Sequence, residues 1–179
     1  MNLPNKLTIL RIALVPVFMA LLCVDSAGCR IAALGVFILA SVTDWADGYI
    51  ARKYNLISTF GKFMDPLADK ILTTAAFLVF VSEGIISPWA VMLVLAREFA
   101  VAGIRLCAAA GGDVIAASFW GKLKTVSQMV AIIAAIILMH PAFEPHAAVL
   151  ITNILVWISV VFTVLSGADY IWKNRKLFK

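Results

Sequence analysis

Six long hydrophobic stretches, separated by short polar breaks, make up almost the whole chain. Each is close to the roughly 20 mostly apolar residues that an α-helix needs to cross a bilayer. The breaks contain glycine, proline, serine or asparagine, which favour turns. The pattern therefore predicts an all-α integral membrane protein with six transmembrane helices in a single domain, residues 1–179. The expected helices are Leu7–Val24, Arg30–Ala51, Phe60–Val81, Pro88–Ala110, Phe119–Met139 and Ala147–Trp172.

Composition and charge agree with a membrane protein. Of the 179 residues, 63% are hydrophobic and 14% are charged, whereas a soluble domain is roughly half apolar. The net charge of +5 needs no nucleic acid to explain it, because Lys and Arg gather at one set of helix ends. The opposite ends hold Arg30 with Asp25, Glu83 and Glu144. Since basic loops stay in the cytosol, we expect a protein of the cytoplasmic (inner) membrane with both termini cytosolic.

Four closely spaced aspartates interrupt the hydrophobic pattern. Asp44 and Asp47 lie near the cytosolic end of the second expected helix, and Asp65 and Asp69 near the cytosolic start of the third. Residues three or four apart share a helix face. An Asp at the centre of a membrane helix costs about 2.5–3.5 kcal/mol, and bound cations would remove most of the mutual repulsion. Carboxylates suit Mg²⁺ or Mn²⁺, and two such pairs can hold two ions for phosphoryl transfer.

Two other interpretations of the aspartates stay open. In the first they are interfacial acids that pair with Lys53, Lys62 and Lys70. In the second they form the pathway of a cation channel or transporter. A pathway would spread its acids across the membrane, whereas these acids gather on one side, and this favours a site over a pathway.

The aspartates belong to a longer motif, which reads DWADGYIAR, KYNLISTF and GKFMDPLAD in succession. It fits the pattern D-x-x-D-G-x-x-A-R, eight residues, then G-x-x-x-D-x-x-x-D. The motif resembles the signature of the CDP-alcohol phosphotransferases, and the resemblance covers nearly the whole chain. It implies six membrane helices and a reaction in which CDP-diacylglycerol and an alcohol give a phospholipid and CMP. It also implies a homodimer.

The resemblance further implies roles for individual residues. Metal ligation is implied for Asp44, Asp47, Asp65 and Asp69, the last of which also corresponds to the general base. Contacts with the cytidine diphosphate are implied for Asn5, Thr8, Gly48, Arg52 and Ser58. The chemistry of two of these agrees with such contacts. Gly48 has no side chain and lets a nucleotide come close, and Arg52 can bind a phosphate oxygen.

Basic residues farther along the chain bear on the acceptor alcohol. Arg97 lies inside the fourth expected helix, where a charge is a functional candidate, and Arg105 lies two turns nearer the cytosol. Lys122 and Lys124 begin the fifth helix. Together they are predicted to bind an anionic acceptor. Each also has a plainer explanation: an ion pair with an acid such as Glu98 for Arg97, snorkelling for Arg105, and the positive-inside rule for the lysines.

Three short segments narrow the choice of acceptor. LPNKLTILR, LARE and GKLKT resemble the branch of the family that joins glycerol 3-phosphate to CDP-diacylglycerol. The basic cluster favours a phosphorylated acceptor over zwitterionic serine, but it does not separate glycerol phosphate from inositol phosphate. A second phospholipid, phosphatidylglycerol, is a further alternative. We therefore expect transfer to glycerol 3-phosphate with two Mg²⁺ or Mn²⁺ ions.

Overall fold

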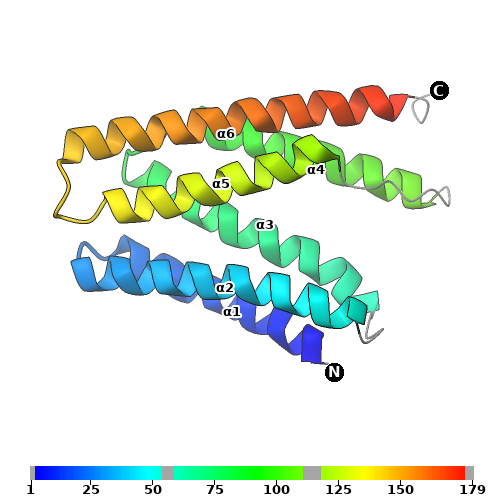
Figure 1. Cartoon of the computed structure of the whole chain (residues 1–179), viewed down its shortest axis with the longest axis horizontal. Coiled ribbons are helices and arrows are strands. Elements are labelled where there is room, and N and C mark those ends of the chain that lie inside the picture. The colour runs from blue at the N-terminus through cyan, green and yellow to red at the C-terminus, as the bar shows by residue number, and fades with distance from the viewer. Residues whose placement is uncertain (1–2, 54–58, 111–117, 176–179) are drawn as a thin grey trace.

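The computed structural model describes residues 3–53, 59–110 and 118–175. Within these ranges the regular structure is helical throughout (Figure 1). The all-α fold and the six helices predicted from the hydrophobic pattern are confirmed. The helices are α1 (Leu3–Cys23), α2 (Ala27–Lys53), α3 (Thr59–Ser82), α4 (Pro88–Ala110), α5 (Phe119–Leu138) and α6 (Pro145–Lys173).

The helices form two groups that are joined by α3 and by a direct contact between α2 and α5. α1 packs against α2, and α6 packs against both α5 and α4. α3 crosses obliquely between the two groups in Figure 1 and contacts α1 on one side and α4 and α5 on the other. Both chain termini lie at the same end of the bundle, where α2 ends and α3 begins (Figure 1). The aspartate-bearing ends of α2 and α3 therefore meet near the termini.

The core between the helices combines bulky aromatic residues with alanines. Phe18 of α1 and Phe37 of α2 are fully buried, and their ring centroids lie 5.7 Å apart. Ala76 of α3 and Ala135 of α5 are also fully buried. Small residues at such contacts let helix backbones approach closely, which is how helices pack in a membrane, where lipid tails are as apolar as the helices.

The outer surface of the bundle is apolar, as expected of a protein surrounded by lipid. Four helices, α1, α2, α5 and α6, are long and apolar enough in their described parts to cross a membrane, so this is a multi-pass membrane protein. α4 carries three charged residues, Arg97, Glu98 and Arg105. In α3 the apolar described part is shorter, Lys70–Ser82. α3 and α4 lie in the same bundle as the other four helices. That these two helices also cross the membrane stays a prediction.

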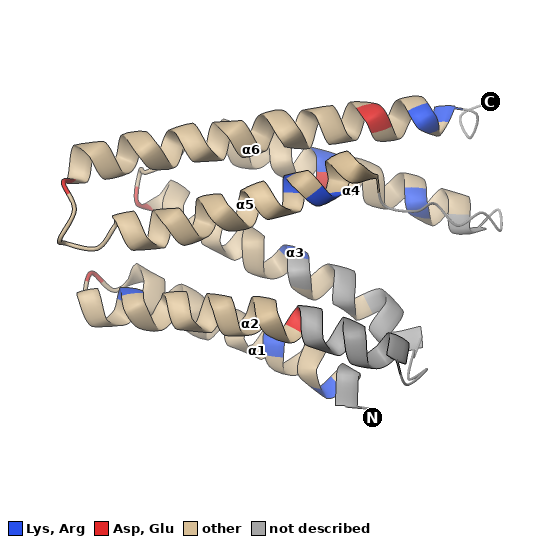
Figure 2. Cartoon of the chain, viewed as in Figure 1, with Lys and Arg blue, Asp and Glu red and all other residues tan. Residues whose placement is uncertain are grey.

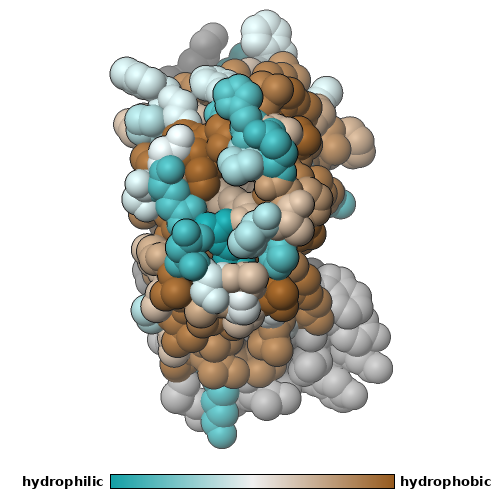
Figure 3. All heavy atoms as spheres, turned by 90° about the vertical axis from the view of Figure 1, so that its left-hand side faces the viewer, coloured by the Kyte–Doolittle hydropathy of each residue, from teal (hydrophilic) through white to brown (hydrophobic). Residues whose placement is uncertain are grey.

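The two ends of the bundle differ in charge. Lys and Arg gather toward the end that holds the termini (Figure 2). At the opposite end Arg30 donates to Asp25 at 3.0 Å, and partial burial raises the pKa of Glu83 while Arg30 opposes this. Seen onto this end, hydrophilic side chains gather in the middle of a largely hydrophobic surface (Figure 3). This asymmetry is the basis of the predicted orientation.

The turn from α3 into α4 depends on one glycine. Gly84 has a φ of +71°, in the left-handed region that glycine adopts without strain. Its N–H donates to the Val81 carbonyl at 3.0 Å, and the Ile85 N–H donates to the Phe80 carbonyl at 2.9 Å. These two bonds form a Schellman motif, which satisfies carbonyls that the end of α3 leaves without helical partners.

Gly84→Ala is expected to lower the free energy of unfolding by about 1–2 kcal/mol, the cost of a left-handed backbone for a residue with a β-carbon. A β-carbon would meet no atom within 4 Å at Gly84, and none at Gly35 in the helical interior of α2. Gly35→Ala is therefore the matched control and should be no less stable than the parent. Denaturant unfolding in detergent micelles measures both, and equal stability of the two variants would contradict the proposed strain.

Candidate functional site

One face of α1 is polar and buried near the end that holds the termini. Asn5, Thr8 and Arg11 follow one another at three-residue spacing and so share this face. Their exposed fractions are 7%, 0% and 1%. Arg11 Nη1 forms an ion pair with Oδ1 of Asp44, which lies on α2 and is 41% exposed. Asn5 and Thr8, two of the five residues predicted to contact the nucleotide, thus lie on the helix face that reaches the first predicted metal ligand.

Arg11 is a residue whose role the sequence motifs did not predict. The sequence did mark Arg11 as unusual, because it is a basic residue inside the first apolar stretch, three positions after Thr8. A guanidinium stays charged at any physiological pH, so Arg11 offsets part of the negative charge of Asp44 and fixes the direction of that carboxylate. Such an arginine suits a site that gathers several carboxylates.

The four aspartates all lie on helices, as predicted. Asp44 and Asp47 belong to α2, Asp65 and Asp69 belong to α3, and the two helices contact each other. The side chains of Asp47, Asp65 and Asp69 lie outside the described residues. Among the side chains that are described, no group of three His, Cys, Asp or Glu could hold a metal ion. The helical spacing and the carboxylate donors fit a hard divalent cation, and the metal site stays a prediction.

For three of the residues predicted to contact the nucleotide, the structure does not describe the side-chain position. Gly48 and Arg52 lie on α2, but their side-chain surroundings are not described. Ser58 lies between the described ranges, which end at residue 53 and resume at 59. Their assignment to the cytidine diphosphate remains a prediction.

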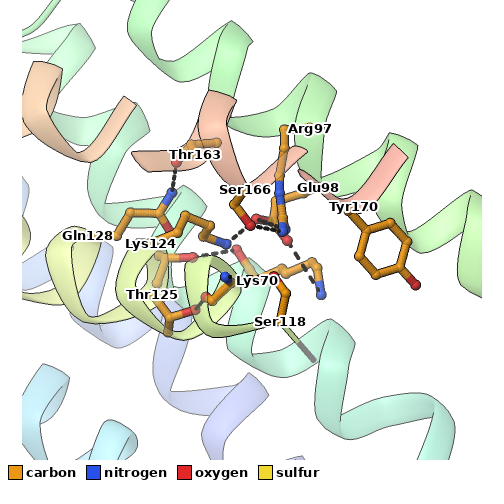
Figure 4. A network of polar contacts seen from close by, with 12 residues as sticks. Lys70, Arg97, Glu98, Ser118, Lys124, Thr125, Gln128, Thr163, Ser166 and Tyr170 are labelled. Carbon is orange, nitrogen blue, oxygen red and sulfur yellow. Dashed lines mark hydrogen bonds and ion pairs between the residues drawn. The ribbon is translucent and has the colours of Figure 1, made fainter. Parts of the chain in front are cut away.

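A second polar site surrounds Glu98 on α4, where three cations converge on one buried carboxylate (Figure 4). Lys124 of α5 forms a close ion pair with Glu98 Oε1. Arg97 Nη1 donates to the same oxygen at 3.3 Å, and Lys70 Nζ of α3 lies 3.8 Å from Oε2. The side chains of Glu98, Arg97 and Lys124 are only 11%, 12% and 8% exposed. Three helices therefore supply one charged cluster inside an apolar bundle.

α6 contacts this cluster through the side chain of Arg97. Arg97 Nη2 donates to Ser166 Oγ at 2.6 Å, as Figure 4 shows. The next residue, Gly167, lies so close to the Arg97 stem that a β-carbon there would come within 3.0 Å of Arg97 Cγ. Glycine at this position lets the arginine side chain pass along α6 and reach Ser166 and Glu98 together.

The four predicted acceptor residues fall into two pairs. Arg97 and Lys124 meet at Glu98, so the ion pair considered for Arg97 exists, and Glu98 also binds Lys124. Arg105 and Lys122 are exposed. Arg105 Nε donates to the Tyr170 hydroxyl at 3.3 Å, and its guanidinium carbon lies 5.6 Å from the centre of that ring. The structure therefore brings Arg97 and Lys124 together and leaves the other pair apart from Glu98.

A cavity of about 370 Å³ opens beside the cluster. Its polar wall includes Lys70, Glu98 and Lys124, together with Thr125 and Gln128 of α5. The rest of its lining is mostly apolar and comes from α1, α3 and α4. Such a cavity accommodates an amphiphilic ligand, with a charged group at the lysines and an apolar part along the helices.

Lys70 and Glu98 are further residues for which the motifs predicted no binding role. Glu98 was visible as a second charge next to Arg97 inside an apolar helix, and Lys70 directly follows Asp69. The sequence did not reveal that Lys70 and Glu98 lie close together, because this depends on how α3 and α4 pack.

The chain matches known proteins over nearly its full length. The family model described as CDP-alcohol phosphatidyltransferase matches residues 1–165. The CDP-diacylglycerol–glycerol-3-phosphate 3-phosphatidyltransferase of Bacillus subtilis (strain 168) is 43% identical over 194 aligned residues, which cover 99% of this chain and 97% of that protein. The protein of the same name from Rickettsia bellii is 37% identical, with 99% and 97% covered. A probable phosphatidylglycerophosphate synthase of Mycobacterium tuberculosis is 36% identical, with 95% and 80% covered.

Proposed function

This chain belongs to the CDP-alcohol phosphatidyltransferase family, and we propose that it transfers the phosphatidyl group of CDP-diacylglycerol to glycerol 3-phosphate, releasing CMP. The structural observation that supports glycerol 3-phosphate as the acceptor is the buried cluster at Glu98. Three cations around one carboxylate suit an acceptor that brings its own phosphate. The relatives that carry the name of this activity match along nearly all of both chains, which supports the same assignment.

The nucleotide side of the site belongs to α1, α2 and the start of α3. Asp44, Asp47, Asp65 and Asp69 would hold two Mg²⁺ or Mn²⁺ ions. When bound, such ions neutralise a pyrophosphate and orient the attacked phosphorus. Arg11 holds Asp44 in place through its ion pair. The cytidine diphosphate is assigned to Asn5, Thr8, Gly48, Arg52 and Ser58.

The acceptor side supplies the base and the phosphate ligands. Asp69 accepts the proton of the glycerol hydroxyl as its oxygen attacks the phosphorus that bears the diacylglycerol. The bond from that phosphorus to the CMP oxygen breaks, and CMP leaves. The acceptor's own phosphate does not react, so its binding serves to place the hydroxyl. Its ligands are proposed to be Arg97, Arg105, Lys122 and Lys124, and of these four Lys124 lines the cavity beside Glu98.

The placement in the cell follows from the charge asymmetry of the bundle. The end with the termini, most of the Lys and Arg and the aspartates is assigned to the cytosol, in the cytoplasmic (inner) membrane. Water-soluble glycerol 3-phosphate and CMP then reach and leave the site from the cytosol. The protein is assigned as a homodimer, as the family resemblance implies.

A panel of acceptors tests the proposed function. Purified protein in detergent receives CDP-diacylglycerol and Mg²⁺ with glycerol 3-phosphate, inositol 1-phosphate, serine or phosphatidylglycerol, and CMP release is measured. We expect rapid release with glycerol 3-phosphate alone. Release with serine or inositol phosphate, and none with glycerol 3-phosphate, would overturn the acceptor while leaving the aspartate chemistry intact. No release with any alcohol would favour the channel or transporter interpretation.

A further inference from the structure

The described part of the cluster at Glu98 holds three basic side chains and one carboxylate. Lys70, Arg97 and Lys124 each lie within ion-pair distance of Glu98. The side chains of Arg97 and Lys124 are 12% and 8% exposed, and that of Lys70 is 33% exposed. Basic side chains gathered in a partly buried place favour a bound anion, because they can donate charge-assisted hydrogen bonds to it. A phosphate monoester brings about two negative charges at neutral pH and several oxygens that accept such bonds.

The cavity selects which cations such an anion would touch. Lys70 and Lys124 line it, and Glu98 lies between them on the same wall. Arg97 does not line the cavity, because Glu98 and Ser166 hold its two Nη atoms at the cluster's α6 side. An anion in the cavity would therefore meet the two lysine amino groups, while Arg97 binds the carboxylate that holds Lys124.

Resting on the proposed function, we propose that Lys70 is a further ligand of the acceptor's phosphate and that Glu98 is a positioning residue. Glu98 binds Lys124 through Oε1 and lies 3.8 Å from Lys70 through Oε2. It thereby holds on one wall two flexible, mutually repelling side chains. A phosphate with several terminal oxygens can then accept from both amino groups.

The position of Lys70 links the two halves of the site. It directly follows Asp69 along α3, so one turn of this helix carries both the proposed base and a proposed phosphate ligand. A phosphate bound at Lys70 keeps the acceptor's hydroxyl near the end of α3 that faces the nucleotide. An acceptor without the phosphate would lose this placement.

The kinetic test compares Lys70→Met, Glu98→Gln and the double variant with the parent. Lys70→Met should raise the KM for glycerol 3-phosphate about tenfold to a hundredfold, as expected for a lost charge-assisted hydrogen bond, and leave the KM for CDP-diacylglycerol within about twofold. Lys70→Arg should recover part of the loss. The matched control is Lys173→Met, because Lys173 is 62% exposed and pairs with Asp169 at 2.8 Å, and both KM values should stay at the parent's.

Glu98→Gln should also raise the KM for glycerol 3-phosphate, and the double variant should cost less than the product of the two single effects, because both act through the same phosphate contact. An unchanged KM in Lys70→Met would overturn the role of Lys70. An unchanged or lower KM in Glu98→Gln would show that the carboxylate only reduces the local charge, and would overturn the positioning role.

A binding test separates this inference from the proposed function. Inorganic phosphate, added without lipid or nucleotide, should raise the unfolding temperature of the parent in detergent but not that of Lys70→Met, or of Lys70→Gln where the methionine variant fails to fold. If the parent uses no glycerol 3-phosphate yet shows this difference, the function is wrong and the anion site stands. If phosphate stabilises the parent and the variant alike, or neither, the inference is overturned even where the reaction is confirmed.

Discussion

Asp69→Asn should lower kcat for CMP release about 10²–10⁴-fold, the usual contribution of a positioned general base. The amide keeps the shape of the carboxylate but lacks the basic oxygen that we propose takes the hydroxyl proton. Helix content measured by circular dichroism should be unchanged, because the substitution removes no apolar packing. Turnover by the purified variant at saturating CDP-diacylglycerol and glycerol 3-phosphate provides the measurement.

Two controls interpret the result for Asp69. Asp25→Asn makes the same substitution at the opposite end of the bundle, in an 89%-exposed carboxylate that pairs with Arg30, and such surface pairs contribute about 0–1 kcal/mol. It should keep full turnover. Raising the Mg²⁺ concentration separates the two roles of Asp69. Recovery at high Mg²⁺ would reduce Asp69 to a metal ligand, and near-normal turnover at any concentration would transfer the base to another group.

Removal of divalent cations by a chelator is expected to abolish CMP release, and Mg²⁺ or Mn²⁺ should restore it. The physical reason is the concentration of four carboxylates on two neighbouring helices, which repel one another and the pyrophosphate of the substrate unless cations intervene. Full activity in excess chelator would rule out the proposed site.

The same cations should also stabilise the protein without substrate. A ligand present at 100 times its dissociation constant adds about 2.7 kcal/mol to the free energy of unfolding, so the unfolding temperature in detergent should rise with Mg²⁺. An Asp47→Asn, Asp65→Asn double variant should lose this rise, whereas Asp25→Asn should keep it. A rise of equal size in both would assign the effect to another place on the protein.

The helices were predictable from hydrophobicity because the membrane imposes length and apolarity on each span. The residues at which the helices begin and end were harder to predict. The first helix was expected from Leu7 and begins at Leu3, and the second was expected to end at Ala51 and ends at Lys53. Hydrophobicity marks where lipid surrounds the chain, whereas a helix continues as long as its backbone hydrogen bonds do, so polar end turns extend past the apolar run.

The cluster at Glu98 shows what the sequence alone could not resolve. Lys122 and Lys124 are two residues apart in the same basic segment, yet Lys122 is exposed and Lys124 buried. Residues two apart lie on opposite sides of a helix, so the rotation of α5 against its neighbours decides which lysine reaches Glu98. That rotation follows from the packing of α5 against α6, α2 and α3, which a single sequence does not reveal.

The oblique path of α3 places it between the helices assigned to the two substrates. α1 and α2 carry most of the residues predicted to contact the nucleotide, and α4 and α5 carry most of the proposed acceptor residues. α3 contacts both groups, and α2 also contacts α5 directly. We therefore expect substitutions in α4 and α5 to alter the alcohol that reacts more than they alter the use of the donor. In evolutionary terms, this arrangement favours lineages that change the lipid they make through one part of the fold while the other part stays nearly the same.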